Sequence, residues 1–284
     1  MARRQRLDAE LVRRGLARSR QHAGELVAAG RVAVAGRTAA KPATQVELGA
    51  AIEVADAAAG PAYVSRGAHK LAGALDAFDG VVVEGRRCLD AGASTGGFTD
   101  VLLRRGAEHV VCVDVGYGQL AWSLRQDPRV TVLDRTNVRE LTPDQVAPAP
   151  GLVVADLSFI SLRLVLPALA RCATADADWV LMVKPQFEVG RERLGAGGVV
   201  RQPGLRAEAV RDVAAAAAAE GLRVRGVVAS PLPGPSGNVE YFLHLARDAD
   251  DPGAVLRWDE AERSRVAALV DRAVAEGPGG VGAR

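Results

Sequence analysis

The sequence predicts an α/β protein in which a doubly wound parallel sheet follows a small α+β domain. From Ser65 onward, short apolar strand patterns alternate with helical patterns, which is typical of a parallel sheet with crossover helices. Before Ser65, two short helical patterns are followed by segments whose apolar residues alternate as in a strand. The 284-residue length, with 49% apolar and 25% charged residues, fits a globular protein of about two domains.

The first domain is expected to begin with two helices. Residues 6–14 repeat apolar side chains at helical spacing, and Gly15 follows as a C-cap would. Ser19 can cap a second helix that ends at Gly30. The alternating pieces RVAVAGR and QVELGAAIEVA then predict short strands. The uncharged stretch AAAGPA, at 57–62, marks the expected domain boundary.

The second domain is expected to start with a helix that Ser65 caps. The predicted strands lie at residues 87–91, 109–114, 130–133, 152–156, 179–184, 222–229 and 239–245. The predicted later helices lie at residues 97–105, 162–172, 205–221 and 259–276. The expected division of the chain is a small α+β domain at 1–60, a linker at 61–64, the α/β domain at 65–250, and a C-terminal helix and frayed tail at 251–284.

The net charge of +2 is unevenly distributed. Residues 1–41 contain ten Lys/Arg and three Asp/Glu, a local +7, which leaves 26 basic and 31 acidic residues, or −5, for the rest. A compact basic segment is typical of a polyanion-binding surface. A solvated basic face without a partner is the alternative. The candidate phosphate-binding side chains are Arg4, Arg6, Arg18, Arg20 and Arg31.

The text CLDAGASTGGFTDVL leads from a strand through a small-residue turn into a helix, where doubly wound sheets bind nucleotide-like cofactors. Ser94 stands where the dinucleotide fingerprint has glycine, and no Gly-Lys-Ser/Thr follows as in a P-loop. The pattern instead resembles the S-adenosylmethionine site of Rossmann-like methyltransferases. A tight structural turn is the alternative. The candidate cofactor-binding residues are Asp90, Gly92, Ser94, Gly96, Gly97, Phe98, Asp114 and Asn137.

Two of these residues follow later strands. Asp114 ends the next predicted strand, where its carboxylate can bind both ribose hydroxyls of the cofactor. Asn137 follows the third strand and can either line the adenine pocket or cap a helix.

Four scattered charges complete the candidate site. Asp156 ends the strand LVVAD and Lys184 ends the strand VLMVK, so both are expected at the carboxyl edge of the sheet. A charge at the end of such an apolar strand needs a partner or a catalytic role. By spacing alone, Lys70 and Glu240 are ordinary surface charges.

Six segments, VSRGAHKL, LDAGASTGGFTD, DVGYGQL, ADLSFISL, KPQFEVGR and GNVEYFLHL, together resemble the TlyA family over nearly the entire chain. The resemblance implies an N-terminal alpha-L RNA-binding motif joined to an FtsJ-like methyltransferase domain. It implies 2'-O-methylation of cytidine in ribosomal RNA, 16S and/or 23S, within ribosomal subunits. The family's catalytic Lys-Asp-Lys-Glu set corresponds to Lys70, Asp156, Lys184 and Glu240, with Lys184 acting on the 2'-hydroxyl proton.

The chain departs from the family at the linker. Family members have Arg-x-Trp-Val there, whereas this sequence has Pro61, Ala62, Tyr63 and Val64. The departure puts in doubt any coupling of RNA and cofactor binding through the linker. The alternative functions are a small-molecule methyltransferase and an RNA-binding protein with a degenerate methyltransferase body.

Other classes of protein are disfavoured by specific absences. The apolar runs fall far short of the roughly 18 residues of a membrane span, and the basic N-terminus lacks the apolar region of a secretory signal. We therefore expect a cytoplasmic protein with no membrane contact, which gives no support to the haemolysin name that some family members carry. The three cysteines are far apart and without neighbouring His, so neither a disulfide framework nor a metal site is expected. The sequence does not indicate an oligomeric state.

Overall fold

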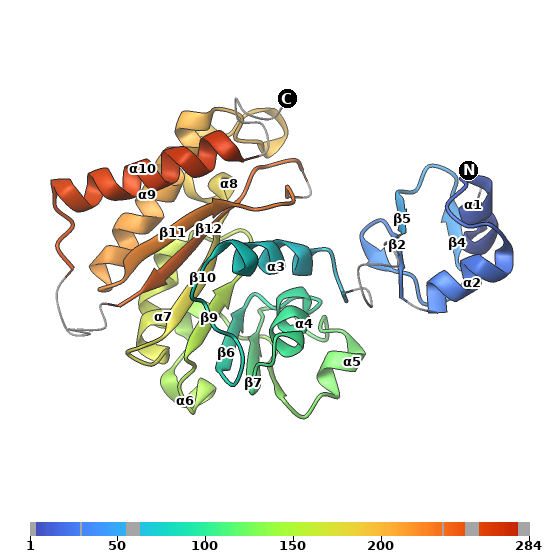
Figure 1. The fold of residues 1–284 in the computed structure, drawn as a ribbon, viewed down its shortest axis with the longest axis horizontal. Helices are drawn as coiled ribbons and strands as arrows, with labels where there is room; N and C mark the ends of the chain where they lie inside the picture. Colours follow the sequence, from blue (N-terminus) through green and yellow to red (C-terminus); the bar gives the residue numbers. More distant parts are fainter. Residues whose placement is uncertain (1–3, 29, 55–62, 235, 248–255, 278–284) are drawn as a thin grey trace. The chain divides into compact units, whose positions relative to one another are not determined.

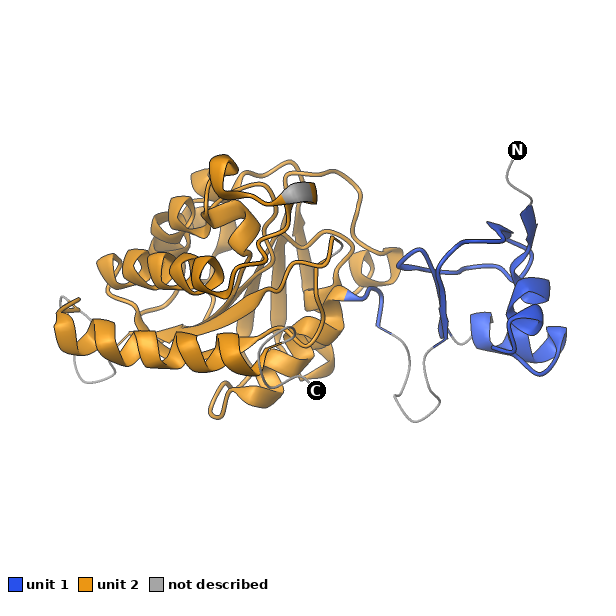
Figure 2. Cartoon of the chain, turned by 90° about the horizontal axis from the view of Figure 1, so that it is seen from above, with its two compact units in different colours: residues 1–66 blue, residues 67–284 orange. Residues whose placement is uncertain are grey.

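The fold is described from a computed structural model. The described residues are 4–28, 30–54, 63–234, 236–247 and 256–277. The chain divides into two compact units, Met1–Arg66 and Gly67–Arg284 (Figure 2). The boundary expected at 57–62, the first half of the expected linker and the tail after residue 277 lie outside the described residues.

The first unit has the two helices and short strands that the sequence predicts. Its helices are α1 (Leu7–Arg13) and α2 (Arg20–Ala28). The strand β1 (Arg4–Arg6) pairs antiparallel with β4 (Gln45–Glu47), and β2 (Val32–Val34) pairs antiparallel with β3 (Arg37–Thr38) and β5 (Ile52–Val54). Apolar side chains from both helices, including Leu7, Leu11 and Leu26, form its core with Val32 and Val46.

Two turn signals in this unit behave as the sequence predicts. Gly15, with φ +72°, follows α1 in the left-handed conformation that favours glycine after a helix. The Ser19 hydroxyl accepts a hydrogen bond from the backbone N–H of His22 at 3.1 Å, as an N-cap does.

The second unit is built on a seven-stranded sheet with the order β11-β12-β10-β9-β6-β7-β8 (Figure 1). Its strands are β6 (Arg87–Ala91), β7 (His109–Val113), β8 (Val130–Leu133), β9 (Leu152–Ala155), β10 (Asp178–Val183), β11 (Arg223–Ala229) and β12 (Tyr241–Ala246).

The expectation of a wholly parallel sheet is wrong at one strand. β12 runs antiparallel to both of its neighbours, β10 and β11. The connection from β11 to β12 contains no crossover helix among its described residues, and a parallel pair needs a crossover connection of a dozen or more residues. The connection that carries Glu240 therefore folds back as a hairpin.

Helices cover both faces of the sheet. They are α3 (Gly67–Ala77), α4 (Gly97–Arg104), α5 (Trp122–Arg125), α6 (Pro143–Val146), α7 (Leu166–Cys172), α8 (Pro185–Glu188), α9 (Pro203–Ala219) and α10 (Glu260–Glu276). α3 and α4 pack together, and α7, α9 and α10 contribute to the large core cluster on the sheet (Figure 1).

Two predicted helix starts differ from the structure. The helix expected at 162–172 begins as a short 3-10 turn, Leu162–Leu164, before α7. α3 begins at Gly67, and Ser65, expected to cap it, instead forms an isolated antiparallel bridge with Arg37. Both differences are local and leave the order of the elements unchanged.

Three further observations concern disulfides, metal sites and membrane spans. The three cysteines are free and buried. Across the described ranges, His, Cys, Asp and Glu side chains form no group of three or more suited to holding a metal ion. In the part of the chain that the structure describes, no helix is both long enough and apolar enough to cross a membrane.

Candidate active site

The glycine-rich turn after β6 requires glycine at two positions. Gly92 has φ +87°, and a Cβ there would lie 2.6 Å from the backbone oxygen of Asp156. Gly96 has φ +94° and precedes α4, and a Cβ there would meet the side chains of Leu120 and Leu124. The turn therefore lies directly against the ends of the neighbouring segments, and only a glycine backbone fits.

Asp114 ties this turn to the end of β7. Its Oδ2 accepts the backbone N–H of Ser94 at 2.8 Å, and its Oδ1 accepts the N–H of Gly116 at 2.7 Å. Ser94 and Asp114, which the sequence assigns to one cofactor site, are thus in direct contact. Each carboxylate oxygen accepts one N–H here and keeps a lone pair for a ligand hydroxyl.

Asp90 is fully buried under α4. The Thr99 hydroxyl donates to Asp90 Oδ2 at 2.6 Å, while Oδ1 has no hydrogen-bond partner among the described residues. The pKa of Asp90 is raised to about 7, mainly by burial; the Thr99 hydrogen bond opposes this rise, and the nearby negative charges of Asp156 and Asp114 contribute to it. The side chain thus supports the turn from beneath.

Three other predicted cofactor residues have structural contacts. Gly97 is the first residue of α4. Phe98 is buried, and its ring centroid lies 6.1 Å from that of Phe242 in the core. Asn137 accepts the backbone N–H of Arg139 at 3.1 Å and caps the 3-10 turn Val138–Glu140, which is the capping alternative that the sequence left open.

Lys184 and Asp156 come together at the carboxyl edge of the sheet. They follow β10 and β9, which are neighbouring parallel strands, so both strands end at the same edge. Lys184 Nζ lies 2.6 Å from Asp156 Oδ1 and donates to the Ser158 hydroxyl at 2.9 Å. The Lys184 side chain is 11% exposed, so most of it is buried at this edge.

Lys70 and Glu240 form a buried ion pair, which contradicts their interpretation as surface charges. Lys70 Nζ lies 2.5 Å from Glu240 Oε2, and the side chains are 8% and 1% exposed. Glu240 Oε1 accepts from the Gln186 side chain at 3.3 Å. A Cβ on Gly234 would lie 2.7 Å from the same oxygen. Because Gln186 follows Lys184 by two residues, this contact joins the buried pair to the Lys184 segment.

Sequence reasoning missed several side chains beside Lys184. Ser158 binds Lys184, and Gln186 binds Glu240. Phe159, with φ +64°, is 92% exposed, and its ring centroid lies 5.2 Å from that of Phe187. The signal that could have found them is position, because each lies within three residues of a strand-end charge.

The candidate RNA-binding arginines of the first unit are mostly paired. Asp8 binds both Arg6, at 2.8 Å, and Arg20, at 3.0 Å, which holds the pKa of Asp8 well below its usual range. Arg4 lies 3.5 Å from Glu47. Arg18 is exposed and Arg31 is half-buried.

Two basic residues that the sequence analysis did not select have structural roles. Arg13 and Arg14 bind the buried Glu10 and lower its pKa to about 2. Arg14 also donates to the backbone oxygens of Leu48 and Ala50, each at 2.7 Å, so it ties α1 to the strand segment.

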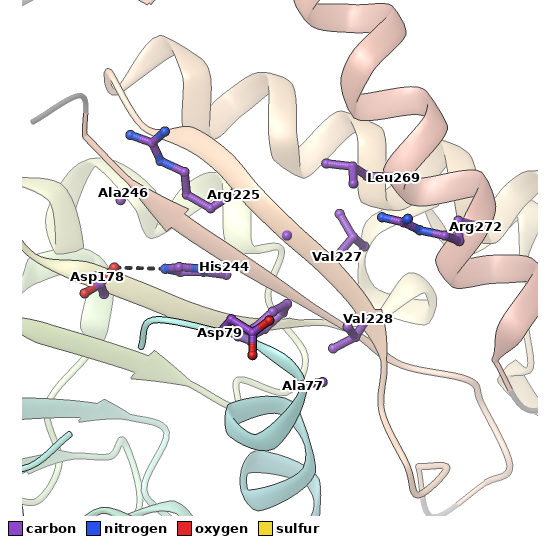
Figure 3. A pocket seen from close by; sticks show the side chains of 12 residues that line it. Ala77, Asp79, Asp178, Arg225, Val227, Val228, His244, Ala246, Leu269 and Arg272 are labelled. Carbon is purple, nitrogen blue, oxygen red and sulfur yellow. Dashed lines mark hydrogen bonds and ion pairs between the residues drawn. The ribbon is translucent and has the colours of Figure 1, made fainter. Parts of the chain in front are cut away.

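A hollow lies at the other end of β10 from Lys184, beside Asp178. It has a volume of about 480 Å³ and lies among the end of α3, β11, β12 and α10 (Figure 3). Polar residues are part of its lining: His244 Nε2 lies 2.9 Å from Asp178 Oδ1, and Arg225 and Arg272 come from β11 and α10 (Figure 3). None of the predicted site residues lines it.

Comparisons with known proteins show which family the chain belongs to. The FtsJ-like methyltransferase model matches residues 63–247, and the S4 domain model matches residues 5–52. A Mycobacterium tuberculosis protein named 16S/23S rRNA (cytidine-2'-O)-methyltransferase TlyA is 60% identical over 278 residues, covering 98% of this chain and 100% of the relative. The chain belongs to the TlyA family.

Proteins with other names also match. Hemolysin A of Brachyspira hyodysenteriae is 35% identical over 84% of this chain and 99% of its own. A solved structure from Streptococcus thermophilus that carries a hemolysin name is 36% identical, covers 96% of each chain, and has a TM-score of 0.69. Family membership makes this chain a methyltransferase that uses S-adenosylmethionine, and confirms the predicted family, fold class, enzyme class and cofactor.

Proposed function

We propose that this chain transfers the methyl group of S-adenosylmethionine to the 2'-oxygen of cytidine in ribosomal RNA, 16S and/or 23S, within ribosomal subunits in the cytoplasm. The name of the Mycobacterium tuberculosis relative and the pairing of an S4 domain with an FtsJ-like domain support this substrate. The observation that carries the chemistry is Lys184, held between Asp156 and Ser158 at the sheet edge beside the glycine-rich turn.

The residues at the turn fit the cofactor. S-adenosylmethionine, when bound, supplies a methyl group on a positively charged sulfur. Asp114 and Asp156 give this edge carboxylates that suit cationic sulfonium and ammonium groups, and the buried Asp90 Oδ1 has no partner among the described residues. The backbone around Gly92 and Ser94 would hold the cofactor, and Asp114 would accept its ribose hydroxyls.

Lys184 is the group that would receive the proton of the ribose 2'-hydroxyl. Its nitrogen has three positions besides its own carbon: it donates to the Ser158 hydroxyl at 2.9 Å, and Asp156 Oδ1 lies beside it at 2.6 Å as an ion-pair partner. The third position is the one that a substrate hydroxyl would occupy. The bound cofactor would supply the methyl carbon to the 2'-oxygen with loss of its bond to sulfur, and the hydroxyl proton would pass to Lys184. The protein therefore contributes positioning and proton transfer.

The Lys70–Glu240 pair would act one step away from the reacting atoms. Glu240 binds Gln186, two residues after Lys184, so the buried pair fixes the segment that carries the lysine. In the first unit, the exposed arginines around Arg18 would contact RNA phosphates, which fix the orientation of a bound RNA.

The test is transfer of labelled methyl to ribosomes and to isolated subunits that lack the modification, followed by mapping of the modified nucleotide. Wild-type chain should label a cytidine ribose, whereas Lys184→Ala should lose most of the rate. Lys184→Arg is the matched control that separates charge from proton transfer, because arginine keeps the positive charge of the lysine but cannot accept a proton near neutral pH. Calorimetric binding of S-adenosylmethionine by both variants would show that the turn is intact. Cofactor binding by the wild type without transfer to any RNA would contradict the proposal.

A further inference from the structure

Two loops leave the carboxyl edge of the sheet beside Lys184 and are tied together twice. The β9 loop, residues 156–163, follows β9. The β10 loop, residues 184–189, follows β10 and contains the short helix α8. The first tie is at their base, where Lys184 binds Asp156 and Ser158. The second tie is at their far ends, where Glu188 of the β10 loop meets the β9 loop.

Glu188 makes this second tie with both carboxylate oxygens. Its Oε2 accepts the Ser161 hydroxyl at 2.5 Å, and its Oε1 accepts the backbone N–H of Leu162 at 2.8 Å. Arg163 adds a third contact, since its Nε lies 3.4 Å from Oε2 and its Nη2 donates to the Glu188 backbone oxygen at 3.2 Å. Three consecutive residues of one loop are thus bound to a single residue of the other.

Burial makes these contacts obligatory. The Glu188 side chain is 1% exposed, and burial raises its pKa even though Ser161, Leu162 and Arg163 lower it. A buried carboxylate that loses a hydrogen bond is left unsatisfied at considerable cost. If the β9 loop moved away from α8, the Glu188 carboxylate would lose its hydrogen bonds to Ser161 and Leu162 while still buried. This penalty fixes the distance between the far ends of the two loops.

Three side chains beside Lys184 lie between the two ties, namely Ser158, Phe159 and Phe187. Ser158 is bound to Lys184, and Phe159 packs its ring on Phe187, whose own ring centroid lies 5.9 Å from Lys184 Nζ. Phe159 is also in the left-handed region, at φ +64°, which an aromatic residue holds only when its surroundings impose it. This segment therefore depends on being held at both ends.

We infer that Glu188 is a positioning residue for methyl transfer, which holds the β9 loop so that Ser158 and Phe159 keep their places beside Lys184. The inference rests on the proposed function. Glu188 touches none of the reacting groups and acts through Ser161 and Leu162. No part of this tie involves the glycine-rich turn or Asp114, which follow β6 and β7.

The test uses Glu188→Gln in the full chain. The amide has nearly the same shape, but both Ser161 and Leu162 donate to the carboxylate, and an amide offers them only one accepting oxygen. We expect kcat for methyl transfer to unmodified ribosomal subunits to fall about tenfold, because small displacements of reacting groups have large effects on rate. The Kd for S-adenosylmethionine should stay within about twofold of wild type, since the turn is untouched.

Ser161→Ala is the second variant, and it keeps the Leu162 contact and the carboxylate. It should reduce kcat less than Glu188→Gln, and the double variant should fall little further, because both changes break the same tie. Glu208→Gln is the matched control, since Glu208 is a half-exposed glutamate on α9 whose side chain pairs with Arg193. It should leave kcat unchanged.

Hydrogen exchange supplies a readout independent of activity. Amides of residues 157–163 should exchange faster in Glu188→Gln than in wild type, while those of the glycine-rich turn should not change. Wild-type activity together with an unchanged kcat in Glu188→Gln, or with equal exchange in both proteins, would overturn this inference alone. A wild-type chain that transfers no methyl to RNA would overturn the proposed function instead, whatever the exchange data show.

Discussion

Removing one partner of the Lys70–Glu240 pair should destabilise the second unit by about 3–5 kcal/mol. The size of this effect follows from burial, because the side chains are only 8% and 1% exposed and their charged atoms lie 2.5 Å apart. Either single change leaves the other charge in a site that solvent does not reach. Lys70→Met and Glu240→Gln each remove one charge, and the amide at 240 keeps an oxygen for Gln186.

The double variant separates the ion pair from the packing around it. With both charges gone, no unpaired charge remains, so the double variant should lose less stability than the two single changes together, by about 2 kcal/mol or more. The measurement is urea unfolding of the full chain followed by circular dichroism, fitted as two transitions because the chain has two compact units. Any transition of the first unit serves as an internal control, since neither residue belongs to it.

Additive effects, within about 0.5 kcal/mol, would refute this reasoning, since they would mean that the two charges do not depend on each other. Methyl transfer by the same variants adds a second distinction. If the pair also serves the reaction, the double variant should regain much of its stability while its activity stays low.

Three further predictions concern other positions. Burial raises the pKa of Asp90 from 3.8 to about 7, so the folded protein should lose stability as the pH rises between those values, by at most about 4 kcal/mol. Asp90→Asn should abolish this dependence in urea unfolding at pH 5 and 8. Gly92→Ala should weaken S-adenosylmethionine binding in calorimetry because its Cβ would meet the Asp156 oxygen, whereas Gly80→Ala, with φ +93° and open space, tests backbone strain alone. Arg18→Ala should lower the salt dependence of RNA binding by about one counterion in a filter-binding titration.

The strand-end residues were predictable from sequence because they depend on local pattern. Apolar runs fix β9 and β10, and parallel neighbours end at the same edge, so the meeting of Asp156 and Lys184 follows from position alone. The contact between Asp114 and the glycine-rich turn follows in the same way, from the pairing of β6 with β7.

The Lys70–Glu240 pair was not predictable from pattern, since its members are 170 residues apart. Their meeting depends on the reversal of β12, which brings the start of that strand to the edge where α3 begins. The local sequence also did not show which way a side chain faces. Phe98 follows the glycines of the turn, yet it points into the core against Phe242.

Gly92 shows why cofactor binding and catalysis are not independent in this fold. Sequence reasoning assigned its missing side chain to the approach of a ligand, but the structure places the oxygen of Asp156 2.6 Å from where a Cβ would be. The Asp156 N–H also donates to Ala91 at 3.0 Å, so the backbone on both sides of this contact is fixed. Any displacement of the turn therefore moves the residue that binds Lys184. The turn that would hold the methyl donor and the carboxylate that orients the lysine are parts of one rigid contact, and a change in either should alter both binding and rate.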